Sequence, residues 1–285
     1  MSGIVLGDNQ YGKAETHVVR VTRSGLQDEI KDLTVSVALA GDFAATHLTG
    51  DNSNVVPTDT QKNTVFAFAR DGIDEIEDFG LRLARHFTGE FDAVERARVA
   101  IEEHPWDRID GHAFVRAGSE IRLTTVTCTK QSAWVVGGLT DLVVLKSAGS
   151  EFWGYPRDRY TTLPETKDRI LATAVTARWR YSSAEHDWGR SFTEARRLLL
   201  ETFAKQRSLS LQQTLYAMGE AVLTARPEIV EIRMSMPNKH HFVVDLSPFG
   251  LNNENEVFYA ADRPYGLIEG ALVREHASDA GHAWE

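Results

Sequence analysis

Residues 33–39, LTVSVAL, decide the fold of this chain. Large apolar side chains alternate there with smaller ones, which is the pattern of an extended strand with one buried face. Leu33, Val35 and Val37 share the inward face, whereas Thr34 and Ser36 point outward. The rest of the chain must therefore supply partner strands and a layer that covers this face.

A loop and two helices are expected after this strand. Residues 41–57 are rich in Gly, Asp, Asn, Thr and Ser, which is typical of a loop. Thr58 or Asp59 can then cap a helix, because their side-chain oxygens accept hydrogen bonds from first-turn amides. Apolar residues recur at helical spacing until Gly89, namely Ile73, Ile76, Phe79, Leu83 and Phe87.

The same order of elements is expected a second time. Turns that contain proline, at 104–107 and 237–239, join paired strands, and Pro227 ends a helix. Strands are expected around Val19 and Val21 and at 33–39, 97–103, 112–117, 121–129, 134–146, 175–181, 229–236 and 241–246, with further helices at 192–204 and 211–225. The order strand, strand, helix, helix, strand, strand thus occurs twice, which predicts two units, residues 1–131 and 132–285.

Hairpin-paired strands with consecutive helices between them predict an antiparallel sheet with helices on one face, so the fold class is α+β. Long strands with uncovered edges favour closure into a barrel by self-association, because closure removes the edges. Neither a low-complexity tract nor a flexible linker interrupts the pattern. The two units should therefore form one rigid body.

Composition narrows the classes of function. Of the 285 residues, 42% are hydrophobic and 25% are charged, which is ordinary globular usage, and no apolar run approaches the ~18 residues of a spanning helix. A net charge of -10 repels polyanions, so we expect neither a nucleic acid nor an anionic membrane as a partner. A small anionic substrate stays possible, because one buried arginine can set the local potential of a pocket.

Motifs for cofactors and metals are missing from the sequence. Neither a Gly-rich phosphate loop after a strand nor a Gly-x-Ser-x-Gly elbow occurs, and Cys128 is the single cysteine. Among the ten histidines, the only close pair, His240 and His241, would point to opposite faces of a strand and could not chelate one metal. We therefore expect no cofactor, and an oxidase of this kind would take electrons directly from its substrate.

Six short segments have sequences that are more specific than strand and helix formation alone requires. They are YGK at 11–13, TD at 58–59 ahead of KNT at 62–64, FWGY at 152–155, RDRYTTL at 157–163, DRIL at 168–171 and PNKH at 237–240. In this order the chain resembles the urate oxidase family over about nine-tenths of its length. The resemblance implies the tunnelling fold, with two such repeats per chain and a homotetramer that encloses a barrel.

The resemblance also implies a substrate-binding set. Phe152 would stack on the purine ring, while Arg169 and Gln212 would each hold one edge of it. Leu211 would offer its backbone N–H, and Asp59 would contribute mainly through its backbone amide. A flat, electron-rich anion such as urate needs this combination of a stacking face and in-plane hydrogen-bond partners.

A proton relay is the second implied set. Lys13, Thr58 and His240 match the relay of the family, Thr58 also contacts the substrate, and Asn238 would face the oxygen or water position. A hydroxyl both donates and accepts protons, and an imidazole titrates near neutrality, so these groups suit the task. Because Lys13, Thr58 and Asp59 fall in the first repeat and the others in the second, each site is expected to combine two subunits.

Each of these residues taken singly has a simpler explanation. Phe152 would be core, Arg169 an ion-pair partner, Thr58 a helix N-cap, Gln212 a solvated first-turn residue, His240 a hydrogen-bonded structural histidine and Lys13 a surface lysine. Their joint occurrence at the family's motifs is what favours a functional role.

The implied reaction is the oxidation of urate by O2 and water to 5-hydroxyisourate and hydrogen peroxide, without a cofactor. The concerted reaction of a singlet substrate with triplet oxygen is spin-forbidden, so removal of a further proton from urate would make it a better one-electron donor. Proton handling and positioning in a dry pocket would be the protein's task.

Two other functions stay open at this point. Pterin-processing enzymes of the tunnelling fold bind similar heterocycles, although they typically need metal ligands or a different acid anchor. A non-catalytic purine-binding barrel protein would not need a relay. The last residues, 283–285, differ from a peroxisomal Ser-Lys-Leu signal, so we expect a cytoplasmic protein.

Overall fold

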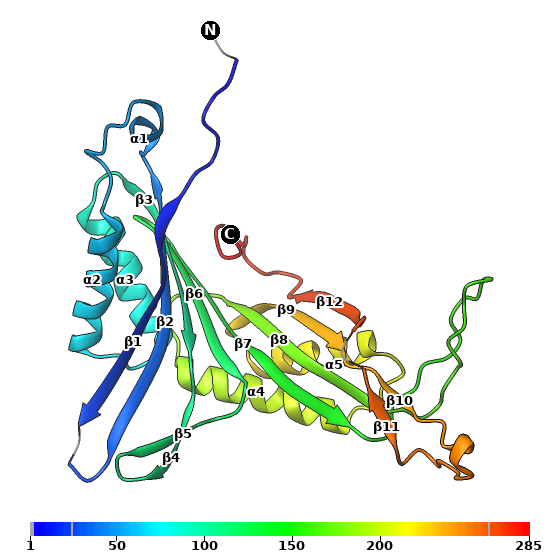
Figure 1. The fold of residues 1–285 in the computed structure, drawn as a ribbon. Helices are drawn as coiled ribbons and strands as arrows, with labels where there is room; N and C mark the ends of the chain where they lie inside the picture. The colour runs from blue at the N-terminus through cyan, green and yellow to red at the C-terminus, as the bar shows by residue number, and fades with distance from the viewer. Residues whose placement is uncertain (1–2, 24, 262) are drawn as a thin grey trace.

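One eight-stranded antiparallel sheet runs through the computed structural model, which describes residues 3–23, 25–261 and 263–285 (Figure 1). Its strands, in spatial order, are β1 (Tyr11–Arg23), β2 (Asp28–Gly41), β3 (Val94–Glu103), β6 (Ile121–Thr129), β7 (Ala133–Lys146), β8 (Leu171–Tyr181), β9 (Ile229–Asn238) and β12 (Gly266–Val273). Neighbours in the chain are neighbours in the sheet, and β1 and β12 form its two edges.

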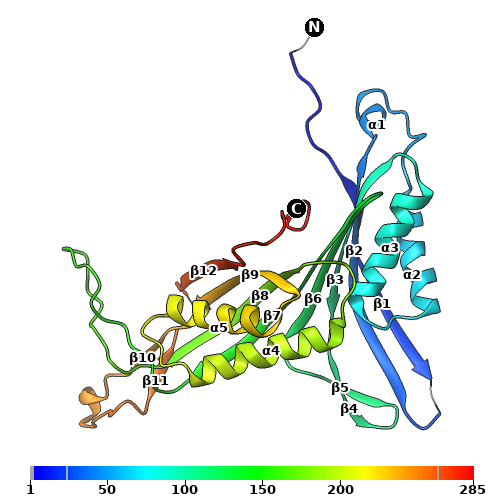
Figure 2. The ribbon, with the colours of Figure 1, turned by 180° about the vertical axis from the view of Figure 1, so that it is seen from behind.

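Helices cover the apolar face of this sheet. They are α2 (Thr58–Asp71) and α3 (Ile76–Glu90) beside the strands of the first half, and α4 (Trp188–Lys205) and α5 (Leu211–Ala225) beside those of the second half (Figure 2). In β2, Leu33 and Val35 are fully buried under this layer, whereas Thr34 between them is only partly buried. No helix in the described ranges is long and apolar enough to cross a membrane.

The order strand, strand, helix, helix, strand, strand occurs twice, as the sequence predicts. The β6–β7 pair joins the two occurrences without a break in the hydrogen-bonded ladder. The expected boundary at residues 131 and 132 falls in the turn of this hairpin, and the division into two units stays a prediction. The antiparallel sheet and the helical layer confirm the α+β class.

The last strand of each unit differs from the sequence prediction. Residues 112–117 were expected as a main-sheet strand, but β5 (Ala113–Arg116) pairs only with β4 (Trp106–Asp110), and 121–129 takes its place as β6. Likewise the strand expected at 241–246 is the short β10 (His241–Val243), which pairs with β11 (Phe258–Ala260) outside the main sheet.

β12 was not predicted, because Gly266 and Gly270 weaken the strand pattern of residues 266–273. Packing explains Gly270: a Cβ there would lie 3.0 Å from a methyl carbon of Leu215 on α5. The glycine that weakens the strand pattern in the sequence is thus packed tightly against the helix that covers it.

The start of α2 also differs from the prediction. Pro57 is the N-cap, so Thr58 is the first helical residue and its side chain does not cap the helix. Proline suits this place because the helix needs no N–H from its N-cap, while the Pro57 carbonyl accepts the first helical bond, from the Gln61 N–H at 3.1 Å. The expected loop before it, 41–57, contains the short helix α1 (Ala44–Leu48), and a further short 3-10 helix, η1 (Ser247–Phe249), follows β10.

The polar face of the sheet is crossed by the C-terminal segment (Figure 1). Arg180 of β8 is buried, pairs with Glu231 of β9 at 3.0 Å and donates to the Ser278 C=O. The guanidinium carbon of Arg233 lies 3.9 Å from the ring centroid of Trp284, so the two side chains pack together. The C-terminal segment therefore contacts the charged side chains of Arg180 and Arg233 on this face.

A buried ionic cluster connects the two halves on the opposite face. Arg122 of β6 contacts the carboxylates of Glu75 and Glu77, each at 2.7 Å, and its guanidinium lies 4.6 Å from the ring centroid of Phe192 on α4. Glu77 is fully buried. Burial raises the pKa of Glu77 to about 7, an effect that the charge of Arg122 only partly opposes.

Replacement of Glu77 by Gln should change how stability depends on pH. Between pH 4.5 and about 7, Glu77 is protonated in the folded protein and ionised in the unfolded chain, so the folded state binds the extra proton. The stability contributed by this proton is present below pH 4.5 and is lost as the pH rises to about 7. As the pH rises across this interval, the Tm of Glu77→Gln should therefore increase relative to that of the parent. The change corresponds to about 1–3 kcal/mol in the difference between their free energies of unfolding.

Thermal unfolding of both proteins between pH 4 and pH 8 measures the effect. Glu90→Gln, at the exposed end of the same helix, is the matched control and should give a curve parallel to that of the parent. A Glu77→Gln curve that is also parallel would show that Glu77 does not titrate differently in the folded state.

Candidate functional site

The first group of expected site residues lies where β1 begins. Gly12 packs so closely on β2 that a Cβ there would stand 1.8 Å from the Val37 carbonyl oxygen, so only glycine fits. Directly after Lys13 the pairing of β1 with β2 shifts register before Thr16, and Glu15 takes a positive φ of 55°. Because of this irregularity, side chains after Lys13 do not continue the regular alternation between the two faces of the sheet.

Thr58 and Asp59 lie at the start of α2, close to Lys13. Hydrogen bonding to Lys62, the charge of Lys62 and a bond from Asn63 hold the pKa of Asp59 below its usual range, and the charge of Lys13 adds to this. Thr58 is exposed, and its side chain does not cap the helix. The first turn of α2 therefore presents a hydroxyl group and backbone amides to its surroundings.

The second group is centred on Arg169. Its guanidinium carbon lies 5.2 Å from the ring centroid of Phe152, and its Nε donates to the Ser150 hydroxyl over 3.4 Å. Phe152 is fixed in turn by two backbone bonds to Thr166 and by a stacked contact with Tyr155, with ring centroids 4.9 Å apart. Burial lowers the pKa of Arg169, so this cation is partly removed from water.

Buried serines and a backbone bridge join Arg169 to the start of α5. Ser150, Ser208 and Thr214 are each fully buried. The backbones of Ser150 and Ser208 form a parallel β-bridge, and the Ser208 hydroxyl accepts from Thr214 over 2.7 Å and donates to the Ser210 carbonyl. The network brings the first turn of α5 towards the arginine.

The first turn of α5 offers backbone donors at Leu211 and Gln212. Ser210 is the N-cap and accepts from the Gln213 N–H at 3.1 Å, while the Gln213 side chain accepts from the Leu209 N–H. Gln213 therefore makes the capping contacts, and the exposed side chain of Gln212 takes no part in them. Leu211 itself is 2% exposed, so its side chain anchors the helix while its N–H points to the helix end.

Asn238 and His240 complete the second group at the end of β9. Asn238 is 9% exposed and lies between Thr173 of β8 and Gly266 of β12. Burial, and then the charge of Arg169, lower the pKa of His240, so its imidazole is neutral near pH 7.

The two groups do not meet within one chain. Lys13 is on the edge strand β1 and Asn238 is on β9, with β2, β3, β6, β7 and β8 between them. Six strand spacings of ~4.8 Å separate these strands by roughly 29 Å along the sheet. Each half therefore presents part of a site, one with a lysine and a hydroxyl group and the other with an aromatic ring, a guanidinium and an imidazole.

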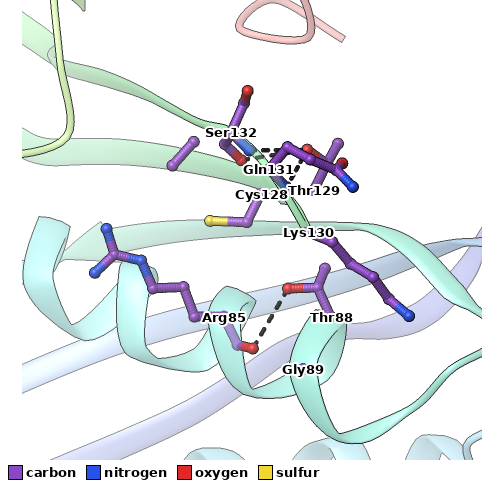
Figure 3. A pocket seen from close by; sticks show the side chains of 9 residues that line it. Arg85, Thr88, Gly89, Cys128, Thr129, Lys130, Gln131 and Ser132 are labelled. Carbon is purple, nitrogen blue, oxygen red and sulfur yellow. Dashed lines mark hydrogen bonds between the residues drawn. The ribbon is translucent and has the colours of Figure 1, made fainter.

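One hollow of the surface has no lining residue from either group. A cavity of about 460 Å³ at α3 and the β6–β7 turn is lined by Arg85, Cys128 and Lys130 (Figure 3). The arginine and lysine side chains point away from each other there, and burial raises the pKa of the Cys128 thiol to about 11, so it stays protonated near pH 7. In the described ranges, no three His, Cys, Asp or Glu side chains are grouped as metal ligands.

Comparison with known proteins places the chain in a family. The uricase family model matches residues 9–127 and 135–269, and the uricase of Arthrobacter globiformis is 57% identical over 281 residues, 98% of this chain and 93% of that protein. The chain belongs to the uricase family. A uricase of Dictyostelium discoideum is 38% identical over 281 residues, 95% of this chain and 98% of that protein.

Solved uricase structures share the fold. The crystal structure of the Arthrobacter globiformis uricase matches with a TM-score of 0.97 and 55% identity, covering 99% of both chains. A urate oxidase structure from Bacillus sp. TB-90 matches with a TM-score of 0.83 at 22% identity, over 93% of this chain and 100% of that one. The uricase fold is thus common to both, and the resemblance in the sequence motifs is confirmed.

Sequence reasoning missed the residues that support this uricase site. Tyr11 stands in the YGK motif beside Lys13, so the motif itself was the available signal. Ser150 and Ser208 carried no signal, because small hydroxyl residues are common in loops and only their burial beside Arg169 distinguishes them.

Proposed function

We propose that this chain oxidises urate with O2 and water to 5-hydroxyisourate and hydrogen peroxide, without a cofactor. The observation that carries the proposal is the match to curated uricases over nearly the whole chain, at 57% identity for the Arthrobacter globiformis protein. This match favours urate oxidation over pterin processing or non-catalytic purine binding. A cytoplasmic setting stays a prediction.

The geometry of the second half supports a site for a flat anion. Phe152 supplies an aromatic face, and the Arg169 guanidinium is a planar fork of donors that can hold two acceptors of the purine in its own plane. Removal of the arginine from water strengthens its attraction for an anion. The first-turn amides of α5, at Leu211 and Gln212, would bind a further edge of the ring.

Proton transfer is assigned to Lys13, Thr58 and His240. The Thr58 hydroxyl is not used as a helix cap, so it can accept a proton from one neighbour and donate to another. His240, neutral near pH 7, can take up the proton that leaves urate. Asn238 would hold O2 or the attacking water beside the deprotonated ring.

Two subunits would build each site. The separation of the two groups within one chain supports this arrangement, because a relay needs its members within hydrogen-bond reach. The open edges β1 and β12 support it as well, since pairing of edges between copies closes the sheet into a barrel. Lys13, Thr58 and Asp59 from one subunit would then meet Phe152, Arg169, Leu211, Gln212, Asn238 and His240 from another, in a homotetramer.

Purified protein treated with a chelator should consume urate and O2 in equal amounts and release peroxide. Loss of urate absorbance, oxygen uptake and peroxide are measured together, with elemental analysis of the sample. Heat-denatured protein is the control. Activity that disappears with a metal and returns on its addition would contradict the cofactor-free reaction.

Arg169→Lys should weaken urate binding, because an ammonium group cannot make two parallel in-plane hydrogen bonds. The loss of one charge-assisted bond costs about 1.5–3 kcal/mol, which is about a 10- to 150-fold rise in Kd. Calorimetry with urate under anaerobic conditions measures binding without turnover. Arg159→Lys, in an exposed part of the RDRYTTL segment, is the matched control, and equal affinities of Arg169→Lys and parent would remove Arg169 from the site.

Mixed assemblies test the shared site. Thr58→Ala and Arg169→Ala chains should each be folded and nearly inactive, and on coexpression they should regain about a quarter of the parental activity. This value follows because random pairing makes about half of the dimers mixed, and each mixed dimer has one intact site of two. Verified mixed assemblies without activity would show that each site is built within one chain.

A further inference from the structure

Tyr11 makes a two-point link between β1 and the segment that leads into α2. Its hydroxyl accepts a hydrogen bond from the Val56 N–H at 2.8 Å and donates one to the Val56 C=O at 3.2 Å. Both bonds end on one residue, so they fix its orientation as well as its distance. Burial raises the pKa of Tyr11, which keeps the phenol protonated and able to donate.

Neighbouring contacts make this link rigid. The ring of Tyr11 packs edge-on against Phe43, with centroids 4.9 Å apart. The Val56 C=O also accepts from the Nε2 of the fully buried Gln61, at 3.3 Å, in the first turn of α2. Val56 is itself 3% exposed, and Tyr11 is partly buried.

The link reaches both first-half members of the proposed relay. Lys13 follows Tyr11 by two positions on the same strand, after a glycine that has no space for a side chain. On the other side, Pro57 connects Val56 to Thr58, and its ring fixes φ. The position of Val56 therefore determines that of Thr58, because Pro57 between them is conformationally restricted.

We propose that Tyr11 is a positioning residue, which holds the Thr58 hydroxyl in register with Lys13 for proton transfer. This inference rests on the proposed function, because it assigns a role within the relay of that site. A relay transfers protons only when its groups lie within about 2.6–3.2 Å, and a misplacement of about 1 Å can cost ~100-fold in rate. Among the described residues of β1, only Tyr11 makes two hydrogen bonds to Val56.

Tyr11→Phe removes both hydrogen bonds and keeps the ring against Phe43. We expect kcat to fall about tenfold, whereas the Kd for urate, measured under anaerobic conditions, should change less than about threefold. Gln61→Met removes only the longer bond to Val56 and should lower kcat less than Tyr11→Phe does. Equal kcat values in Tyr11→Phe and the parent would overturn the proposal.

Tyr181→Phe is the matched control. Tyr181 is a buried tyrosine of β8 whose hydroxyl accepts from the Trp179 Nε1 at 2.9 Å. It pairs with Ile229, at the opposite end of β9 from Asn238. Its variant should lower Tm and leave kcat unchanged. If Tyr181→Phe lowers kcat as much as Tyr11→Phe at an equal fall in Tm, the effect of Tyr11 is one of general stability and the proposal is wrong.

A double-mutant cycle with Lys13→Met separates this inference from the proposed function. Lys13→Met should bind urate nearly normally and turn over about 100-fold more slowly, and Tyr11→Phe should change this residual rate less than about twofold. A further tenfold loss would show that Tyr11 acts independently of Lys13. Full turnover in Lys13→Met would instead overturn the relay, and Tyr11 as its positioning residue with it.

Discussion

The backbone hydrogen bonding that continues from β1 to β12 governs the rest of this structure. Because β6 and β7 pair without a break, the two halves of the chain share one sheet and one apolar face. The helices of each half cover that face, and an ionic cluster around Arg122 joins the two helical layers. The same continuity leaves two open edges at a distance fixed by the number of strands.

This distance separates the proposed site residues into two groups. Lys13 and Thr58 lie in the first half of the chain, where Tyr11 of β1 bonds to Val56 ahead of α2. Arg169 and His240 lie in the second half, where the Arg169 Nε donates to the Ser150 hydroxyl. The proposal that each site combines two subunits follows from this separation.

Buried polar contacts support the proposed site residues. The Ser150 hydroxyl accepts from Arg169, and the Tyr11 hydroxyl bonds to Val56 at the entry to α2. Both hydroxyl groups are hydrogen-bonded, which is the condition under which a buried polar contact gives rigidity. The chemistry of a uricase, which depends on placing O2 and protons beside a bound anion, requires such rigidity on both halves.

The sequence by itself determined the one-sided strands, the helical blocks and the family. Alternation at 33–39 and the helical spacing from Ile76 to Phe87 are local patterns, and the motifs around Lys13, Arg169 and His240 are contiguous. Only the tertiary structure decided that 121–129, and not 112–117, pairs with β3 in the main sheet, that β12 exists in spite of its glycines, and that Pro57 replaces Thr58 as the cap. It also revealed the contact of Tyr11 with Val56. These features depend on which distant residues approach one another, and local propensity contains no information about that approach.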